Sequence, residues 1–131
     1  MGIERLDHLN IRTARLEEMI AWYGDVLGMH PGPRPDFGFR GAWLYAGEFA
    51  LVHLVEVEAE PGADPGDLKL EHGAFQATNM VGFIDKLKSV GQHFEIARIS
   101  GFPIVQVNVW DPDGNHLHID FHVDEADAAG V

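Results

Sequence analysis

The sequence contains no cysteine. Disulfide bonds, thiolate metal sites and cysteine nucleophiles are therefore all excluded, and a metal ion would have to be held by His, Asp or Glu. Basic residues are also few, with nine Lys and Arg against 21 Asp and Glu and a formal net charge of −12. Such a surface repels phosphate groups, so we expect neither nucleic acid nor anionic membranes as partners.

Long hydrophobic runs are absent as well. No stretch approaches the roughly 18 apolar residues of a membrane span, and the N-terminus has no basic region followed by a long apolar one. We therefore expect a cytoplasmic protein. With 131 residues, 46% of them hydrophobic and 23% charged, the chain has the length and composition of a single domain with a packed core, at 1–131.

What the sequence does contain is an internal repeat. LDHLNIRTARLEEMI at 6–20 and LEHGAFQATNMVGFI at 70–84 align without gaps at an offset of 64, which matches His8 with His72. In each copy a strand-like segment with one histidine leads into apolar residues spaced at three- and four-residue steps, a pattern that indicates a helix. The chain is therefore expected to contain the same structural unit twice.

Three strand-like segments follow each helix. Gly28 and Gly91 are placed to end the two helices, and glycine-containing turns separate the segments that follow. An acidic connector rich in Pro and Gly, at 58–67, joins the two copies. We therefore predict an α+β fold of two tandem βαβββ units. The first unit spans about 3–57, the second about 68–123 and a tail 124–131, and the three strands after each helix lie at 35–40, 42–47 and 50–57 and at 93–99, 103–110 and 115–122.

Four histidines stand at equivalent positions of the repeat. His8 and His72 belong to the first strand of each unit, and ALVHLVEV aligns with NHLHIDFH at an offset of 65, so that His53 matches His118. If the first and last strands are neighbours in the middle of each sheet, these side chains converge on one concave face. One strand histidine alone is more often a surface or core residue than a ligand. Four equivalent imidazoles favour a site for one divalent ion of Zn, Fe, Ni, Mn or Co, with His8, His53, His72 and His118 as ligands.

The last predicted strand carries further polar side chains. His116 and Asp120 share the face of His118, because side chains alternate along a strand. We predict that His116 and Asp120 take part in proton transfer beside the metal. The preceding DPDGN is typical of a turn, in which Pro112 and Gly114 set the backbone conformation.

Some other residues have two interpretations. Trp43 and Tyr45 come from a predicted strand that could wall a ligand cavity or pack against its neighbours. Arg40 and Arg98 could hold an anionic substrate, or could be solvated residues at a strand edge.

The segments LDHLNI, WYGDVLGM and DPDGNHLHIDF resemble the vicinal oxygen chelate superfamily, which includes glyoxalase I, extradiol dioxygenases, fosfomycin-resistance proteins and bleomycin-resistance proteins. The resemblance covers nearly the whole chain. It implies cupped mixed β-sheets with helices on the convex side, a divalent metal cofactor and a homodimer. The family pattern puts a histidine in the first strand and usually a glutamate in the last strand of each unit, so His53 and His118 depart from it in the same direction.

The resemblance implies a divalent-metal enzyme that binds a small, oxygen-rich substrate through vicinal oxygens, with lyase, isomerase or dioxygenase chemistry. Four neutral imidazoles would leave the charge of the ion uncompensated, which favours an anionic substrate. A closed tetrahedral site of four histidines would be structural, whereas an octahedral ion would keep positions open. The alternative function is non-catalytic sequestration of a small molecule, as in bleomycin-resistance proteins. An ion shared within one chain and an ion shared across a dimer both fit the pattern.

Overall fold

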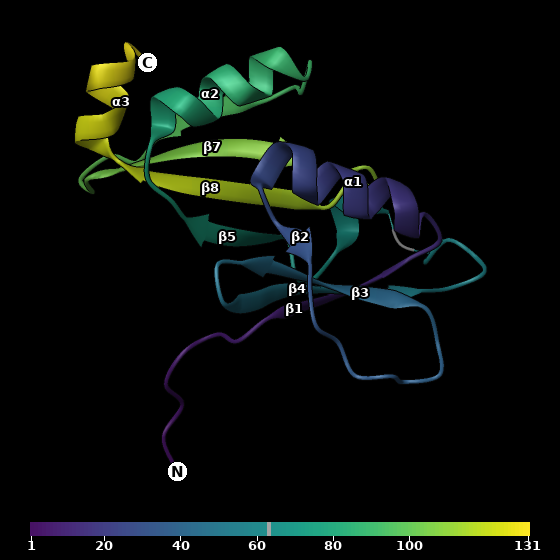
Figure 1. Ribbon diagram of the computed structural model, residues 1–131. Coiled ribbons are helices and arrows are strands. Elements are labelled where there is room, and N and C mark those ends of the chain that lie inside the picture. The colour runs from purple at the N-terminus through teal and green to yellow at the C-terminus, as the bar shows by residue number, and fades with distance from the viewer. Residues whose placement is uncertain (63) are drawn as a thin grey trace. The chain divides into compact units, whose positions relative to one another are not determined.

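The computed structural model describes residues 1–62 and 64–131 and divides the chain into two compact units (Figure 1). The first unit is Met1–Gly62, and the second runs on to Val131. Each unit contains one four-stranded mixed sheet and follows the order βαβββ, which confirms the predicted α+β fold. The single domain at 1–131 and the connector at 58–67 stay predictions, and residue 63 of that connector lies outside the described residues.

The sheet of the first unit has the strand order β1-β4-β3-β2. β1 and β4 are parallel, and the other two pairs are antiparallel. Helix α1 packs its apolar stripe on this sheet, and Met19 and Tyr23 of that stripe are fully buried. The helix ends at Gly28, as predicted, where the backbone φ of 68° suits glycine. The elements are β1 (Leu9–Thr13), α1 (Leu16–Leu27), β2 (His30–Pro31), β3 (Gly41–Ala46) and β4 (Phe49–Glu56).

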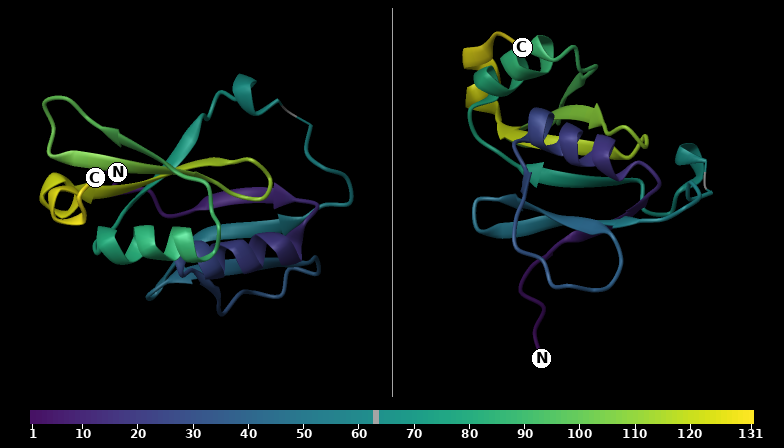
Figure 2. Two further views of the ribbon diagram at one scale, coloured as in Figure 1. Left: turned by 90° about the horizontal axis from the view of Figure 1, so that it is seen from above. Right: turned by 45° about the vertical axis from the view of Figure 1, so that its right-hand side comes forward.

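The sheet of the second unit repeats this topology with the order β5-β8-β7-β6. β5 and β8 are parallel, and β8, β7 and β6 are antiparallel neighbours. Helices α2 and α3 lie side by side in both views of Figure 2. The elements are a 3₁₀ helix η1 (Pro65–Asp67), β5 (His72–Gln76), α2 (Met80–Ser89), β6 (Glu95–Arg98), β7 (Ile104–Trp110), β8 (His116–His122) and α3 (Val123–Ala129).

Each sheet buries one face against the helices of its own unit. In the second unit, Leu117, Ile119 and Phe121 are nearly fully buried, and the Phe121 ring lies 5.7 Å from Phe83 of α2. Because side chains alternate along a strand, the residues between them point to the other face. We call the face that points away from a unit's own helices its distal face. It includes Trp43, Leu51, His53 and Val55 in the first unit and Asn108, His116, His118 and Asp120 in the second.

Two sequence expectations were wrong in detail. The first and last strands of each unit are neighbours, as expected, but β1 and β5 are edge strands of their sheets and not central ones. The segment 35–40 forms no strand, and the second strand of the first unit is β2, at His30–Pro31. Pro35 cannot donate to a ladder, and the Asp36 carboxylate accepts a hydrogen bond from the Gly38 amide in a turn.

The predicted tail at 124–131 is mostly helical. In α3 the His122 side chain accepts a hydrogen bond from the amide of Asp124, and acidic residues occupy the first turn, where the helix dipole favours them. Ala126 is fully buried and anchors the helix on the second unit. Among the described residues, 1–62 and 64–131, no helix has the length and apolar character needed to cross a membrane.

Candidate functional site

Three histidine side chains gather on the distal face of the second unit. The parallel register of β5 and β8 places His72 opposite His116 and Ala74 opposite His118. Each histidine offers one nitrogen that lies within 4.8 Å of the nitrogens offered by the other two. The rings of His72 and His118 are stacked with their centroids 3.9 Å apart, and the His116 and His118 centroids are 4.8 Å apart. We call His72, His116 and His118 the histidine trio.

His118 is the buried member of the trio. Its residue is only 7% exposed, and its Nδ1 atom has no hydrogen-bond partner among the described residues. Burial lowers the pKa of His118, and the neighbouring His72 and His116 lower it further. Burial therefore favours the neutral form of the ring, and its buried Nδ1 atom has no partner among the described residues. Three imidazoles in such proximity, one of them unsatisfied, fit a metal ion well.

A turn positions β8 and therefore the trio. The carboxylate of Asp111 accepts hydrogen bonds from the backbone amides of Asp113 and Asn115 and from the Asn115 side chain. Gly114 has a φ of 84°, which a residue with a side chain rarely adopts. This confirms the turn predicted for DPDGN, and it sets the direction in which β8 leaves β7.

Glu71 links two rings of the trio. One carboxylate oxygen lies 2.7 Å from Nδ1 of His116, and the other contacts Nδ1 of His72. These hydrogen bonds, the one with His72 first, lower the pKa of Glu71 to about 2. The carboxylate is 62% exposed, so it reaches the rings from the solvent side.

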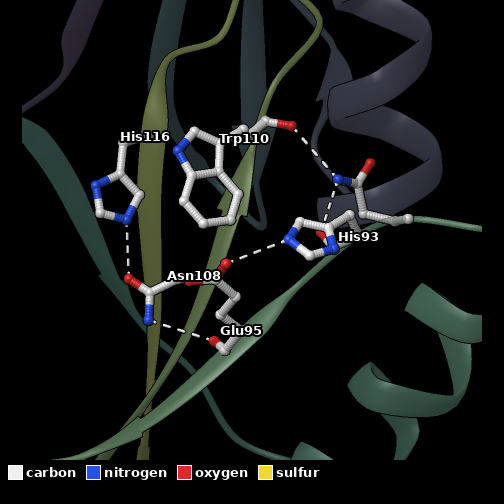
Figure 3. A network of polar contacts seen from close by, with 6 residues as sticks. His93, Glu95, Asn108, Trp110 and His116 are labelled. Atoms are coloured by element: carbon white, nitrogen blue, oxygen red, sulfur yellow. Dashed lines mark hydrogen bonds and ion pairs between the residues drawn. The ribbon is translucent and has the colours of Figure 1, made fainter. Parts of the chain in front are cut away.

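Further polar contacts extend the trio along β7 and β6 (Figure 3). The amide oxygen of Asn108 lies 2.8 Å from Nε2 of His116, and its amide nitrogen donates to the carbonyl of Glu95. Trp110 stacks on the His116 ring at 5.0 Å, and His93 stands 5.8 Å away on the same indole. His116 is thus held by contacts at both ring nitrogens and on one face.

Asp120 follows the trio along the distal face of β8. It pairs in register with Gln106 of β7 and Gln76 of β5. Its Oδ1 atom is buried without a hydrogen-bond partner among the described residues. Burial raises the pKa of this carboxyl group, against the lowering effect of His118 and His72.

The first unit brings together two other histidines. The His8 and His53 rings stack at 3.8 Å, and Trp43 stacks on His53 at 4.1 Å. His53 is 8% exposed, and its Nε2 lies 3.1 Å from the carbonyl oxygen of Ala50. Burial, followed by the proximity of His8, lowers the pKa of His53. The Asp7 carboxylate lies 2.7 Å from Nδ1 of His8.

A cleft of about 660 Å³ borders this pair of histidines. It lies within the first unit, and aromatic side chains supply much of its wall. The Arg5 guanidinium stands 4.9 Å from the centre of the Phe49 ring at its rim. Its lining includes Arg5, His8, Trp43, Tyr45, Phe49 and His53.

Comparison with known proteins decides the family. The sequence model of the Glyoxalase/Bleomycin resistance protein/Dioxygenase superfamily matches residues 5–129. The chain belongs to this superfamily. A curated member, Glyoxylase I 4 from Arabidopsis thaliana, is 31% identical over 125 residues, which cover 91% of this chain and 71% of the relative.

Solved structures from the superfamily show the same fold. A glyoxalase family protein from Bacillus anthracis has a TM-score of 0.75 at 23% identity and covers 93% of this chain and 98% of its own. The trypanothione-dependent glyoxalase I of Leishmania major has a TM-score of 0.70 at 19% identity, with coverage of 98% and 94%. The resemblance inferred from the sequence is therefore confirmed.

The structure sorts the predicted site residues of this superfamily member into two groups. His8 and His53 meet in the first unit, and His72 and His118 meet in the second. A single ion bound by all four stays a prediction. His116, expected to transfer protons, stands with His72 and His118 as a third metal-binding candidate.

Sequence reasoning also missed Glu71 and Asn108. Glu71 carried a signal, because the repeat matches it with Asp7, directly before a histidine in each copy. Asn108 carried none, since only the pairing of β7 with β8 brings it to His116. Arg40 and Arg98 form ion pairs within their own units, with Glu56 at 2.8 Å and with Asp127 at 2.9 Å.

Proposed function

We propose that the chain is a metal-dependent enzyme of the superfamily that binds one divalent ion, of Zn, Fe, Ni, Mn or Co, at the histidine trio. The buried Nδ1 of His118, which has no partner among the described residues, is the observation that carries this proposal. A polar atom without a hydrogen bond destabilises the fold unless a ligand compensates for it. An ion bound there would act as a Lewis acid and stabilise negative charge on substrate oxygens.

The charge of the site favours an anionic substrate. Imidazole ligands are neutral, so they would leave the charge of a divalent ion uncompensated, and Glu71, which lies behind His72 and His116, would offset only part of it. A small substrate with two adjacent oxygens, at least one of them anionic, would complement such a site. The names of the Arabidopsis and Leishmania relatives support glyoxalase-like lyase chemistry, and isomerase or dioxygenase chemistry stays open within the superfamily.

Asp120 is our candidate for proton transfer. Its carboxyl group lies on the distal face beside His118, and burial raises its pKa. A carboxyl group with a raised pKa can accept a substrate proton and release it again, as general acid and base catalysis requires. We assign this step to Oδ1, which is buried and has no partner among the described residues. To bind the ion through Nε2, His116 would exchange its contact with the Asn108 amide oxygen for the metal and keep Nδ1 on Glu71.

The alternative function is sequestration of a small molecule. The cleft of about 660 Å³ in the first unit supports it, because its size and its aromatic wall suit an organic ligand. The two functions can be told apart at the trio, because the enzyme requires an ion there and sequestration does not. A homodimer and a cytoplasmic location, with no nucleic acid or membrane partner, stay predictions that follow from the family and the acidic composition.

Metal content tests the proposal. The purified full chain and the variants His72→Ala and His118→Ala are exposed to an equimolar mixture of the five metals, washed, and analysed by mass spectrometry of the elements. We expect about one ion per wild-type chain and a loss of most of it in both variants. His93→Ala is the matched control, because His93 is exposed and lies outside the trio.

Three further variants decide between the ligand sets. If His8→Ala and His53→Ala also abolish metal binding, the four-histidine prediction holds. If they leave it intact while His116→Ala removes it, the trio alone binds the ion. A wild-type chain without stoichiometric metal, unchanged by any of these substitutions, would contradict the enzyme proposal and favour sequestration.

A further inference from the structure

The carboxylates that precede the first-strand histidines form the same contact in both units. Asp7 contacts Nδ1 of His8, and Glu71 contacts Nδ1 of His72. The two pairs are equivalent at the repeat offset of 64. Adjacent residues in a regular strand point to opposite faces, so strand geometry alone does not produce such a contact. It is possible here because Asp7 and His8 both lie before β1, which begins at Leu9, and because Glu71 lies directly before His72, the first residue of β5.

Burial does not explain these contacts either. The Asp7 side chain is 83% exposed and the Glu71 side chain 62% exposed, so water could satisfy both carboxylates. An exposed pair of this kind contributes little to stability. The effect of the contact therefore lies mainly on the histidine ring.

An ionised carboxylate can only accept hydrogen bonds, so the proton must be on Nδ1 of the ring. In a neutral imidazole the lone pair then lies on Nε2, the nitrogen on the other side of the ring. Metal-binding histidines in proteins commonly hold their second nitrogen in this way, and the partner fixes both the tautomer and the orientation of the ring.

We propose that Asp7 and Glu71 are positioning residues that hold His8 and His72 as the Nδ1–H tautomer, and that Glu71 thereby presents Nε2 of His72 for metal binding at the trio. The proposal rests on the metal-binding function assigned to the site. Glu71 has the larger role because its second oxygen also contacts Nδ1 of His116 and so aligns two members of the trio. Asp7 contacts His8 alone among the described histidines.

The chain offers a matched control. Glu95 lies 3.4 Å from Nε2 of His93, so it is also an exposed carboxylate beside an exposed histidine two residues away. His93 is not part of the trio. Substitution of Glu95 should therefore change neither the tautomer of His72 nor metal binding.

The first measurement uses the metal-free full chain. Long-range ¹H–¹⁵N NMR spectra of the ¹⁵N-labelled protein report the tautomer of each histidine, at about pH 8.5, roughly two units above the usual imidazole pKa. We expect Nδ1–H at His8 and His72 in the wild type. Glu71→Ala should shift His72 toward Nε2–H and leave His8 unchanged, Asp7→Ala should do the reverse, and Glu95→Ala should alter neither.

The second measurement is the affinity for Zn²⁺, determined by competition with a chromophoric chelator. Glu71→Ala should raise the Kd about ten- to a hundredfold, whereas Asp7→Ala and Glu95→Ala, whose histidines lie outside the trio, should leave it unchanged. Retention of Nδ1–H at His72 in Glu71→Ala, or an unchanged Kd, overturns the positioning role. If the variants show the expected tautomer changes but the wild-type chain has no affinity for Zn²⁺, the tautomer assignment is supported and the metal-binding function is overturned instead.

Discussion

The two units of this chain share a fold but differ on their distal faces. At the repeat offset of 65, His53 matches His118, but Leu51 matches His116 and Val55 matches Asp120. The positions between them are apolar and buried in both units. The repeat therefore preserves the buried apolar residues on which the fold depends, whereas the side chains differ on the distal faces, which do not pack against the helices.

This difference suggests a division of roles. In the first unit, His53 lies between the rings of His8 and Trp43, next to an aromatic cleft. In the second unit, the equivalent His118 lies among polar side chains and has an unsatisfied nitrogen. The first unit thus has features suited to binding an organic ligand at its own cleft, whereas the second carries the metal site and the proton-transfer residue proposed above.

The largest effects on stability should come from the hydrophobic cores. They should be equal in the two units, because the two cores are built from equivalent residues. Leu54 and Ile119 are equivalent and nearly fully buried. Leu54→Ala and Ile119→Ala should each lower the free energy of unfolding by about 2–5 kcal/mol, since each leaves a cavity under a helix. Urea unfolding followed by circular dichroism measures this, with the exposed Val81→Ala as control. A cost below about 1 kcal/mol at one site alone would show that the two cores are not equivalent.

The next effect should separate the two units. His116→Leu gives the second unit the residue that the first has at Leu51, and it removes one member of the trio. We expect the Kd for Zn²⁺ to rise by at least about tenfold. His93→Leu is the control, because His93 also stands against Trp110 but outside the trio. An unchanged Kd in His116→Leu would show that His116 does not bind the ion. It would then favour the role in proton transfer that the sequence suggested.

The sequence predicted the fold well because its signals are periodic. The spacing of apolar residues gave the helices, the alternation in NHLHIDFH gave the buried face of β8, and the repeat gave the topology. The strand predicted at 35–40 is absent from the structure. The aromatic residues there suggested a strand, but Pro35 and Gly38 favour a turn. The helix α3 was missed because its seven residues show too little apolar periodicity.

The site was predictable only in part. The repeat identified His53 and His118, and the structure places each beside the first-strand histidine of its own unit. The contact of His116 with His72 depends on the register between β5 and β8, which are separated by α2 and two strands in the sequence. No local pattern encodes that register, so sequence reasoning could place His116 on the right face but not in the trio.

A smaller difference between the units concerns how their helices begin. Asn79 has a φ of 66°, and its side chain accepts a hydrogen bond from the amide of Gly82 at the start of α2. Its counterpart Arg15 makes no side-chain cap at the start of α1. Asn79→Ala should cost about 1–2 kcal/mol, through the lost cap and the left-handed backbone, whereas Arg15→Ala should cost less than about 0.5 kcal/mol. Thermal unfolding measures both, and Asn79→Gly, which relieves the backbone, should cost less than Asn79→Ala.

The smallest effect concerns the ion pairs of Arg40, which join α1 to β4 in the first unit; the second unit instead pairs Arg98 of β6 with Asp127 of α3. The Arg40 guanidinium contacts Glu17 of α1 and Glu56 of β4, and the hydrogen bond from Arg40 lowers the pKa of Glu17 below its usual 4.5. Because this pKa is lower in the folded state, the pair stabilises the fold above about pH 4.5, and its contribution disappears as the pH falls through the folded-state value. Glu17→Gln should therefore be slightly less stable than the wild type at pH 7 in urea unfolding, and equally stable in strong acid. The Glu17 carboxylate is exposed and that of Glu56 is partly exposed, so the difference should also shrink in high salt. A difference that persists in strong acid would show that Glu17 acts through packing and not through its charge.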